Sequence, residues 1–570
     1  GGFDYADDLA KLSASTLVAP GDPDGSKLYS RVASGDMPPA SFGKKPSASE
    51  VAALKTWITS GAVAVETKGR MITPTEVKKL IETDIAAIPE AERSGVAYFD
   101  LSHIYSGSSI GHANQVRKAF FKFVNSVSSA ATIITPTALN EEKTVFKITL
   151  TDFGWELEDI NNLRVQHPYP IDSTAQIQKF PFPDAPQDDI DLEEKIGAPG
   201  APKPGANIDP PQNPIQNSTG VAQASYFRID WFLKVASRAP HYYNLLNTPT
   251  RLFLLEQKIG VDTVANLQAG RVVRAGFANS QVASHQRVIE RHATPAGALW
   301  RTFEFGSSIA QKNIFQSPLG PGAVFEEHSD KRFVADGHEL IYHLPNGLLG
   351  FAIFNGDGNR LNQAPSGQND GIKENGNINV GVSCMSCHKA GFIDKEDQVA
   401  ESATTIPGLF TTKELELIAS LYAGPAVITE NITADSAKYQ QALAALEINP
   451  EADDPISTTA RRYSEPMGLS EGAAYLGLTP EALTEKVKAS ESLQQLLYGA
   501  IAGNSIDRQF WEQNFQNIRR LVENPDLGSI LPNPIEGPCP NCSTGVSSGG
   551  GGSRPPPIAD IDDDIDREDR

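Results

Sequence analysis

A chain of 570 residues is too long for a single hydrophobic core, and its length predicts roughly three to four domains. Its net charge of −21 argues against general nucleic-acid binding and against docking on an anionic membrane, and favours encounters with basic partners. Hydrophobic residues at 40% and charged residues at 21% are typical of a globular protein, and no apolar run approaches the length of a membrane span.

Residues 1–66 form the first predicted unit. The chain begins with Gly1 rather than Met, so we expect a processed or truncated product from which any export signal has been removed. Ser47 and Glu50 form a capping box, and this pattern predicts a helix that ends near Gly61. The unit is therefore predicted to contain a helix in its second half.

The segment before that helix carries Pro-Gly-Asp-Pro-Asp-Gly-Ser-Lys-Leu-Tyr at 20–29 and Asp-Met-Pro-Pro at 36–39. It resembles the distal half of the planctomycete-type cytochrome c domain, and this resemblance implies that Met37 is the second axial ligand of a haem. The C-x-x-C-H that precedes it in that family is absent here. Either that motif lay upstream of Gly1, which we favour because the chain begins where the post-haem segment would begin, or the domain has lost its haem. For Met37 taken alone, the commoner role of a methionine is that of a core residue.

Residues 67–167 are predicted to form a mixed α+β domain. Thr73-Pro-Thr-Glu76 combines an N-cap, a first-turn proline and a capping-box glutamate, which predicts a helix. A second helix is expected at 114–127, and alternating apolar residues at 144–152 predict a half-buried strand. The proline-rich stretch 168–217 is too long for a plain connector, so we interpret it as a linker or an arm.

Residues 218–380 are predicted to form a sheet-bearing domain. Two apolar runs within 339–355 flank Pro-Asn-Gly, which predicts a β-hairpin. The stretch 362–379 is rich in Asn and Gly and leads into the segment that follows.

The most informative motif follows at Cys384-Met-Ser-Cys387-His388. C-x-x-C-H is the attachment sequence of a c-type haem, in which two thiols three residues apart share one face of a helix and the histidine binds the iron. A disulfide, a zinc half-site or a thioredoxin-like pair would need only C-x-x-C. No second Cys/His pair at zinc spacing follows, and the adjoining His388 favours haem.

The blocks Arg271-Val-Val-Arg-Ala-Gly-Phe, Arg287-Val-Ile-Glu-Arg-His, Leu344-Pro-Asn-Gly-Leu and Val382 to His388 together resemble a group of large bacterial proteins with a C-terminal c-type cytochrome segment. The resemblance spans most of residues 70–525 and implies a haem protein rather than a named reaction. Because haem c is attached outside the bacterial inner membrane, the motif predicts a periplasmic or extracellular protein.

Residues 381–531 are predicted to form a helical haem domain. Thr411 and Glu414 form a capping box, and further helices are expected at 435–446, 470–476, 479–488 and 492–523. The tail, 532–570, holds a second pair, Cys539 and Cys542, which lacks the histidine and is interpreted as a small disulfide. Its acidic end is interpreted as disordered.

Function depends on the sixth ligand of the iron, since a strong ligand gives electron transfer and an open position allows a small molecule to bind. His292 is the first candidate and His343 the second, and Met467 is a rival whose ligation would raise the reduction potential. His285 and His338 complete the set.

The sequence thus leaves two functions open for a multidomain α+β chain. The first is an electron-transfer cytochrome with one haem c, and a second if Met37 binds iron, that serves a basic redox partner or a larger assembly. The second is a peroxidase-type haem enzyme in which Arg291 and His292 line the distal pocket. We favour electron transfer because no pattern points to a pocket for an organic substrate.

Overall fold

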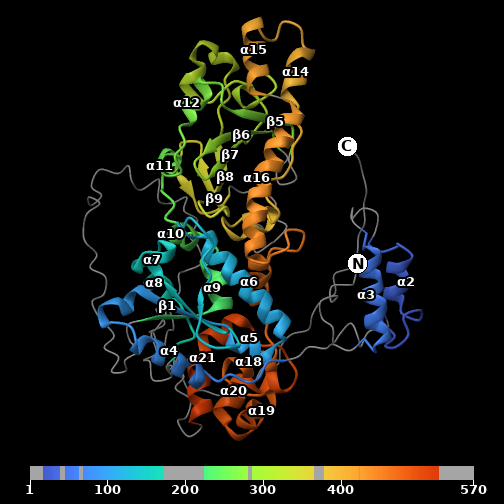
Figure 1. Ribbon diagram of the computed structural model, residues 1–570, viewed down its shortest axis with the longest axis vertical. Coiled ribbons are helices and arrows are strands. Elements are labelled where there is room, and N and C mark those ends of the chain that lie inside the picture. The colour runs from blue at the N-terminus through green and yellow to red at the C-terminus, as the bar shows by residue number, and fades with distance from the viewer. Residues whose placement is uncertain are drawn as a thin grey trace, which may run out of the picture. The chain divides into compact units, whose positions relative to one another are not determined.

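The computed structural model describes residues 17–38, 45–62, 68–171, 224–279, 285–364, 378–422 and 424–524 (Figure 1). All of them belong to the first of two units into which the chain divides, Gly1–Gly528. They form two β-sheets and many helices, which confirms the expected α+β class. Within these ranges no helix is both long and apolar enough to cross a lipid bilayer.

The N-terminal segment has a small core of its own. Helix α2 (Lys27–Ala33) contacts helix α3 (Ala48–Thr59), and the core consists of Val18, Ile58 and Ala62. The capping box of Ser47 and Glu50 forms as predicted at the start of α3.

A four-stranded sheet follows, in the order β2 (Thr137–Ala138), β3 (Val145–Thr149), β1 (Val96–Asp100), β4 (Ser225–Arg228). Only the β1–β4 pair is parallel. The strand expected at 144–152 is shorter than predicted, because the chain turns into helix α7 (Leu150–Phe153). Around this sheet lie 3-10 helix η2 (Glu90–Gly95) and helices α4 (Pro74–Ala86), α5 (Ser102–Gly107), α6 (Ile110–Ser126) and α8 (Leu157–Arg164).

Two of these helices correspond to helices that the sequence predicts. Thr73 and Glu76 form the predicted capping box of α4. The helix expected at 114–127 is α6, which begins earlier because the Ser109 side chain accepts a hydrogen bond from the His112 N–H and caps it. The following stretch, predicted as a linker or arm at 168–217, lies outside the described residues except for 168–171.

Four short helices connect the two sheets: α9 (Ile229–Ala236), α10 (His241–Leu245), α11 (Leu252–Lys258) and α12 (Thr263–Gln268). The second sheet has six strands, all antiparallel, in the order β10 (Arg360–Leu361), β9 (Leu349–Asn355), β8 (Gly337–His343), β7 (Gly297–Glu304), β6 (Arg287–Thr294), β5 (Val273–Phe277). The predicted hairpin is confirmed as β8 and β9. Its turn is closed by a hydrogen bond from the Leu344 N–H to the Leu348 carbonyl, 2.8 Å long, and Gly347 supplies the positive φ of +87° that this turn requires.

Helix α16 (Pro425–Ala445) runs along one face of the six-stranded sheet (Figure 1). Its Ile428 and Ile432 pack with Ala275, Ala298 and Trp300.

Between β7 and β8 in the chain lie 3-10 helices η4 (Ala310–Lys312) and η5 (Gly322–Lys331). Helices α14 (Val399–Thr405) and α15 (Thr412–Leu421) follow β10 in the chain. The capping box of Thr411 and Glu414 forms at the start of α15 as predicted.

The remaining helices are α13 (Val382–Cys387), α17 (Pro455–Ser464), α18 (Leu469–Tyr475), α19 (Pro480–Ala489), α20 (Glu491–Ile501) and α21 (Arg508–Glu523). The prediction of one helix over 492–523 was wrong. Gly503 has a φ of +96°, which ends α20, and the side chain of Asp507 accepts a hydrogen bond from the Phe510 N–H and starts α21.

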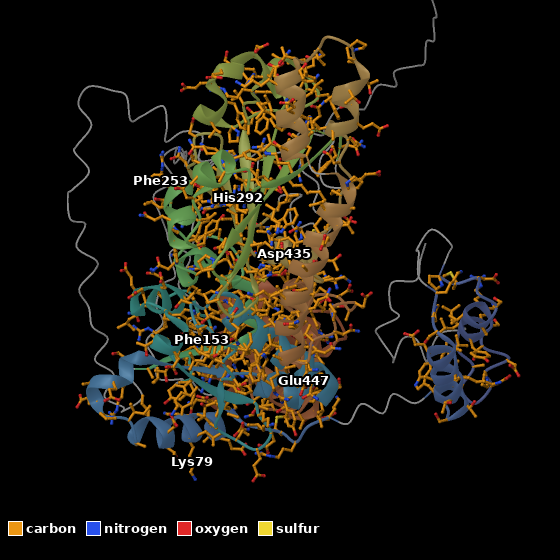
Figure 2. The ribbon with its side chains drawn as sticks, turned by 45° about the horizontal axis from the view of Figure 1, so that its top comes forward. Lys79, Phe153, Phe253, His292, Asp435 and Glu447 are labelled. Carbon is orange, nitrogen blue, oxygen red and sulfur yellow. The ribbon has the colours of Figure 1, made fainter. Side chains whose placement is uncertain are left out.

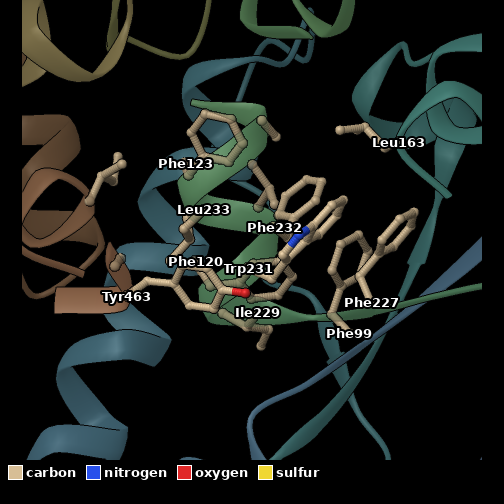
Figure 3. Packing of buried hydrophobic residues seen from close by; sticks show 14 of the residues in the cluster. Phe99, Phe120, Phe123, Leu163, Phe227, Ile229, Trp231, Phe232, Leu233 and Tyr463 are labelled. Atoms are coloured by element: carbon tan, nitrogen blue, oxygen red, sulfur yellow. The ribbon is translucent and has the colours of Figure 1, made fainter. Parts of the chain in front are cut away.

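The main hydrophobic core includes the buried residues of α9, which Figure 3 shows among their neighbours. The ring of Phe232 lies 4.8 Å from that of Phe99 on β1, and the ring of Phe99 lies 4.9 Å from that of Phe120 on α6. The same core includes Leu340 and Phe351 of the second sheet, and it extends to the C-terminal helices. The ranges 67–167, 218–380 and 381–531 predicted as domains therefore share one core, because α6 and α9 both contact α17.

Candidate functional site

The C-x-x-C-H motif lies on α13 and is anchored at Gly381. The φ of Gly381 is +94°, and a Cβ atom at this position would lie 2.3 Å from the Ser237 carbonyl oxygen. The N–H of Val382 donates to that same carbonyl at 2.9 Å. Only glycine allows this close approach, so the start of α13 is fixed against the end of α9.

The two cysteines lie on the accessible side of α13. Cys384 is half-buried and Cys387 is exposed, whereas Val382, Ser383 and Met385 of the same helix are buried. Residues three apart in a helix are neighbours on its surface. The two thiols are therefore positioned to react with one group placed over this face.

His388 follows the last turn of α13 and is half-buried. Its Nδ1 atom lies 3.1 Å from the carbonyl oxygen of Gly391. A carbonyl only accepts, so Nδ1 carries the proton and the Nε2 lone pair is left to bind a metal. Burial lowers the pKa of His388, which also favours the neutral imidazole.

The backbone angle and the close neighbours of position 391 require a glycine there. It has a φ of +120°, and a Cβ atom there would lie 2.7 Å from the Oγ of Ser436 on α16. Helix α16 thus holds the loop whose carbonyl orients His388, as outer-shell partners commonly do for metal-binding histidines.

Aromatic side chains surround the motif. The ring of Phe351 on β9 lies 6.0 Å from the imidazole of His388. Tyr242 and Tyr243 on α10 accept hydrogen bonds from the Phe351 and Ile353 N–H groups through their hydroxyls, each at 3.1 Å, so they tie α10 to the edge of β9.

The donor set fits a c-type haem: two accessible thiols one turn apart and an imidazole with its Nε2 lone pair available. In the ranges that the structure describes, no group of three or more His, Cys, Asp or Glu side chains could hold a bare metal ion.

His292, the first candidate for the sixth ligand, is fully buried on β6 (Figure 2). Its Nε2 lies 2.8 Å from Glu290 Oε1, and its Nδ1 lies 3.4 Å from the Asn266 amide nitrogen. Both ring nitrogens are therefore occupied, and ligation would break both contacts. The sixth-ligand role gains no support here and stays a prediction.

Arg291 and His292 point to opposite faces of the sheet because they are neighbours on a strand. The Arg291 guanidinium binds both carboxylate oxygens of Asp435 on α16, at 2.8 and 3.0 Å. The Trp300 indole N–H donates to the same carboxylate at 2.7 Å. The structure therefore does not bring Arg291 and His292 together into one distal pocket.

The other candidate ligands also have separate surroundings. His343 is buried, with Nδ1 accepting from the Ala298 N–H at 3.1 Å and Nε2 donating to the Asp435 carbonyl at 3.0 Å. His338 is buried beside Arg301, His285 is exposed, and Met467 is buried next to Gly472. Among the described residues, no hydrogen bond or ring contact links any of these side chains to His388.

Met37 is half-buried in the N-terminal segment, where its N–H donates to the Arg31 carbonyl at 3.0 Å. No C-x-x-C-H motif occurs in residues 1–66, so the second haem stays a prediction. Cys539 and Cys542, expected to form a disulfide, lie outside the described residues.

The structure contains a second polar cluster that was not predicted from the sequence. His103 on α5 donates through Nε2 to Asp230 Oδ2 at 3.0 Å and accepts through Nδ1 from Arg228 at 3.0 Å. Arg228 in turn binds Asp100 at 2.8 Å, and the four side chains are all buried. One sequence feature indicates this cluster: Asp230 lies inside the apolar run 229–233. A carboxylate on a helix that faces the core needs a polar or charged partner.

Comparisons with protein-family models, with curated proteins and with solved structures each find no match to this chain.

Proposed function

We propose that this chain is an exported c-type cytochrome of the bacterial periplasm or cell exterior. It binds one haem covalently through Cys384 and Cys387, with His388 as the proximal iron ligand, and passes electrons to a partner. The observation that carries the proposal is the 3.1 Å hydrogen bond between His388 Nδ1 and the Gly391 carbonyl, which leaves Nε2 available for iron. When bound, a haem supplies one-electron redox chemistry.

The charge of the chain supports the choice of partner. A net charge of −21 attracts cations and basic proteins and raises their rate of encounter at low ionic strength. A basic redox partner, or a larger assembly of electron carriers, fits this surface. Met37 would add a second redox centre if it binds a haem whose thiols come from outside residues 1–66.

The alternative, a peroxidase-type enzyme, has no observation in its favour. Arg291 is held by Asp435, and His292 is held by Glu290 on the other face of the sheet. Neither group is positioned to accept or donate a proton at a site that also contains His388.

The first experiment tests attachment. The full chain is produced in a bacterium that carries the c-type haem maturation machinery, and haem is detected on a denaturing gel. A double Cys384→Ser, Cys387→Ser variant should lose all stain attributable to this site, whereas Cys539→Ser with Cys542→Ser, as the matched control, should keep it. Equal staining of both variants would contradict the proposal.

The second experiment tests electron transfer. The reduced protein is mixed in a stopped-flow instrument with a cationic or an anionic metal complex of similar potential. We expect oxidation by the cationic complex to slow with added salt, and oxidation by the anionic complex to accelerate. Slow reaction with both complexes, together with fast reaction with peroxide, would favour the enzyme instead.

A further inference from the structure

A cavity of about 260 Å³ lies among α5, α6, α9, α17 and α18, on residues that the proposed haem site does not use. Its floor is buried and includes His103, Val116 and Asp230. Its other walls include His112 and the exposed Arg462. Sites for drug-sized ligands occupy roughly 300–1,000 Å³, so this cavity suits a smaller molecule.

Asp230 has one carboxylate oxygen in use and one without a partner. Oδ2 accepts from His103 Nε2 at 3.0 Å and from the Tyr475 hydroxyl at 2.5 Å. Oδ1 is buried and has no hydrogen-bond partner among the described residues. Asp230 as a whole is only 6% exposed, so water has little access to its carboxylate. A buried acceptor left unsatisfied costs about 1–3 kcal/mol, so a donor is expected opposite Oδ1.

The carboxylate of Asp230 is ionised at neutral pH. Burial alone would raise its pKa, but His103 and Tyr475 outweigh that effect and hold the pKa well below its usual range. The donor that best suits Oδ1 is therefore a positively charged one.

The other charges around the cavity are paired, with one exception. Glu471 binds Arg508 at 2.5 Å, and Arg228 binds Asp100 at 2.8 Å. The guanidinium of Arg462 has no hydrogen bond or ion pair within the part of the chain that the structure describes. Asp230 and Arg462 thus line the same cavity, and among the described residues Asp230 Oδ1 and the Arg462 guanidinium have no hydrogen-bond partner.

His112 also lines the cavity and is neutral. Its pKa is lowered to about 4, chiefly by burial and also by the charge of Arg462, while the charge of Asp230 opposes this shift. Its Nδ1 lies 3.0 Å from the hydroxyl of Ser108. Ser108 and His112 therefore add a polar but uncharged part to the cavity lining.

We propose that this cavity binds a small zwitterion of the amino acid class. Its ammonium group donates to Asp230 Oδ1, its carboxylate accepts from the Arg462 guanidinium, and its carbon chain lies against Ile104 and Val116. The proposal does not depend on haem, so its failure leaves the proposed cytochrome function untouched.

Calorimetric titration of the full chain with L-alanine, L-valine and 4-aminobutanoate tests it, with butylamine and butanoate as probes that carry one charge each. We expect at least one of the zwitterions to bind about tenfold or more tightly than either butylamine or butanoate, because a zwitterion makes two charge-assisted contacts and each of these probes makes only one. No binding of any zwitterion at millimolar concentration would overturn the proposal and indicate a water-filled cavity. Equal binding of butylamine would overturn it in favour of a simple cation site.

Variants assign the contacts. Arg462→Gln should weaken zwitterion binding by about tenfold and leave butylamine binding unchanged, because one charged hydrogen-bonding group is lost. Arg461→Gln is the matched control, since Arg461 is exposed on the same helix and does not line the cavity. Asp230→Asn should abolish binding of zwitterions and of butylamine. If that variant does not fold, Arg462→Gln still decides, because unchanged zwitterion affinity in it would overturn the proposal.

Discussion

The Nδ1 atom of His388 donates a hydrogen bond to the carbonyl oxygen of Gly391, 3.1 Å away. This bond fixes the tautomer of the imidazole, and helix α16 fixes the loop that carries the carbonyl, through contact of Gly391 with Ser436. His388 lies 48 positions upstream of Ser436 and is thus oriented by a helix outside the C-x-x-C-H motif.

Gly391→Ala should disturb this arrangement. The new Cβ would lie 2.7 Å from the Ser436 Oγ at a φ of +120°, so the loop must move and the Gly391 carbonyl with it. We expect a loss of about 1–3 kcal/mol in the free energy of unfolding in urea and a changed absorption spectrum of the bound haem. Gly408→Ala is the control, because Gly408 has a φ of +78° but no atom within 4 Å. Equal losses in both variants, with identical spectra, would refute the orienting role of this loop.

His292→Ala tests whether this side chain binds the iron or only stabilises the fold. The substitution removes the 2.8 Å contact with the buried carboxylate of Glu290, which Arg274 still pairs. We expect a loss of about 2–4 kcal/mol in the free energy of unfolding, as for other disrupted buried polar networks. A change from a low-spin to a high-spin spectrum would instead establish His292 as the sixth ligand.

Local features of the fold were predictable where the signal lies within a few residues. The three capping boxes, at Ser47, Thr73 and Thr411, form as expected because each needs only a side chain and a backbone N–H three residues apart. The β8–β9 hairpin was predictable because Pro-Asn-Gly lies between two apolar runs. The break between α20 and α21 was missed, although Gly503 and Asp507 supply its signals.

Contacts between distant segments were not predictable from periodicity. His103 and Asp230 are 127 positions apart and belong to different helices. The partners of Arg291 and His292 depend on which face of β6 each side chain takes, and the sequence block that contains them had no assigned strand. The attachment motif was identified from the sequence because its three residues are adjacent, whereas a sixth ligand depends on tertiary structure.

Lys122→Met should destabilise the fold strongly. Lys122 on α6 is 1% exposed and forms a close ion pair with Asp454, which caps the start of α17. Removing the ammonium leaves a buried carboxylate without its cation, so we expect a loss of about 3–5 kcal/mol. Lys118→Met, one turn earlier on α6, removes an exposed ion pair with Glu447 and should change stability by less than about 1 kcal/mol. Urea unfolding of both variants measures the difference, and similar values for the two would contradict this account.

Stability should fall as the pH drops below about 6.5. Burial holds the pKa of His167 well below its usual value, and it lowers the pKa of His112 to about 4 and that of His338 to about 2. The unfolded chain therefore binds protons that the folded chain does not bind, and acid favours unfolding.

His167→Gln isolates one of these groups. It should reduce the slope of unfolding free energy against pH, between pH 6 and 4, by up to about 1.4 kcal/mol per pH unit. A slope that stays the same in His167→Gln would show that His167 is protonated in the folded state.

The count of covalently bound haem tests the central claim most directly. The intact mass of the purified full chain, together with the spectrum of its reduced pyridine complex, gives that count. We predict at least one haem c per chain in the wild type, with one fewer in the Cys384→Ser, Cys387→Ser variant. A wild-type chain that matures alongside a known c-type cytochrome in the same cells and carries no covalent haem would contradict the account.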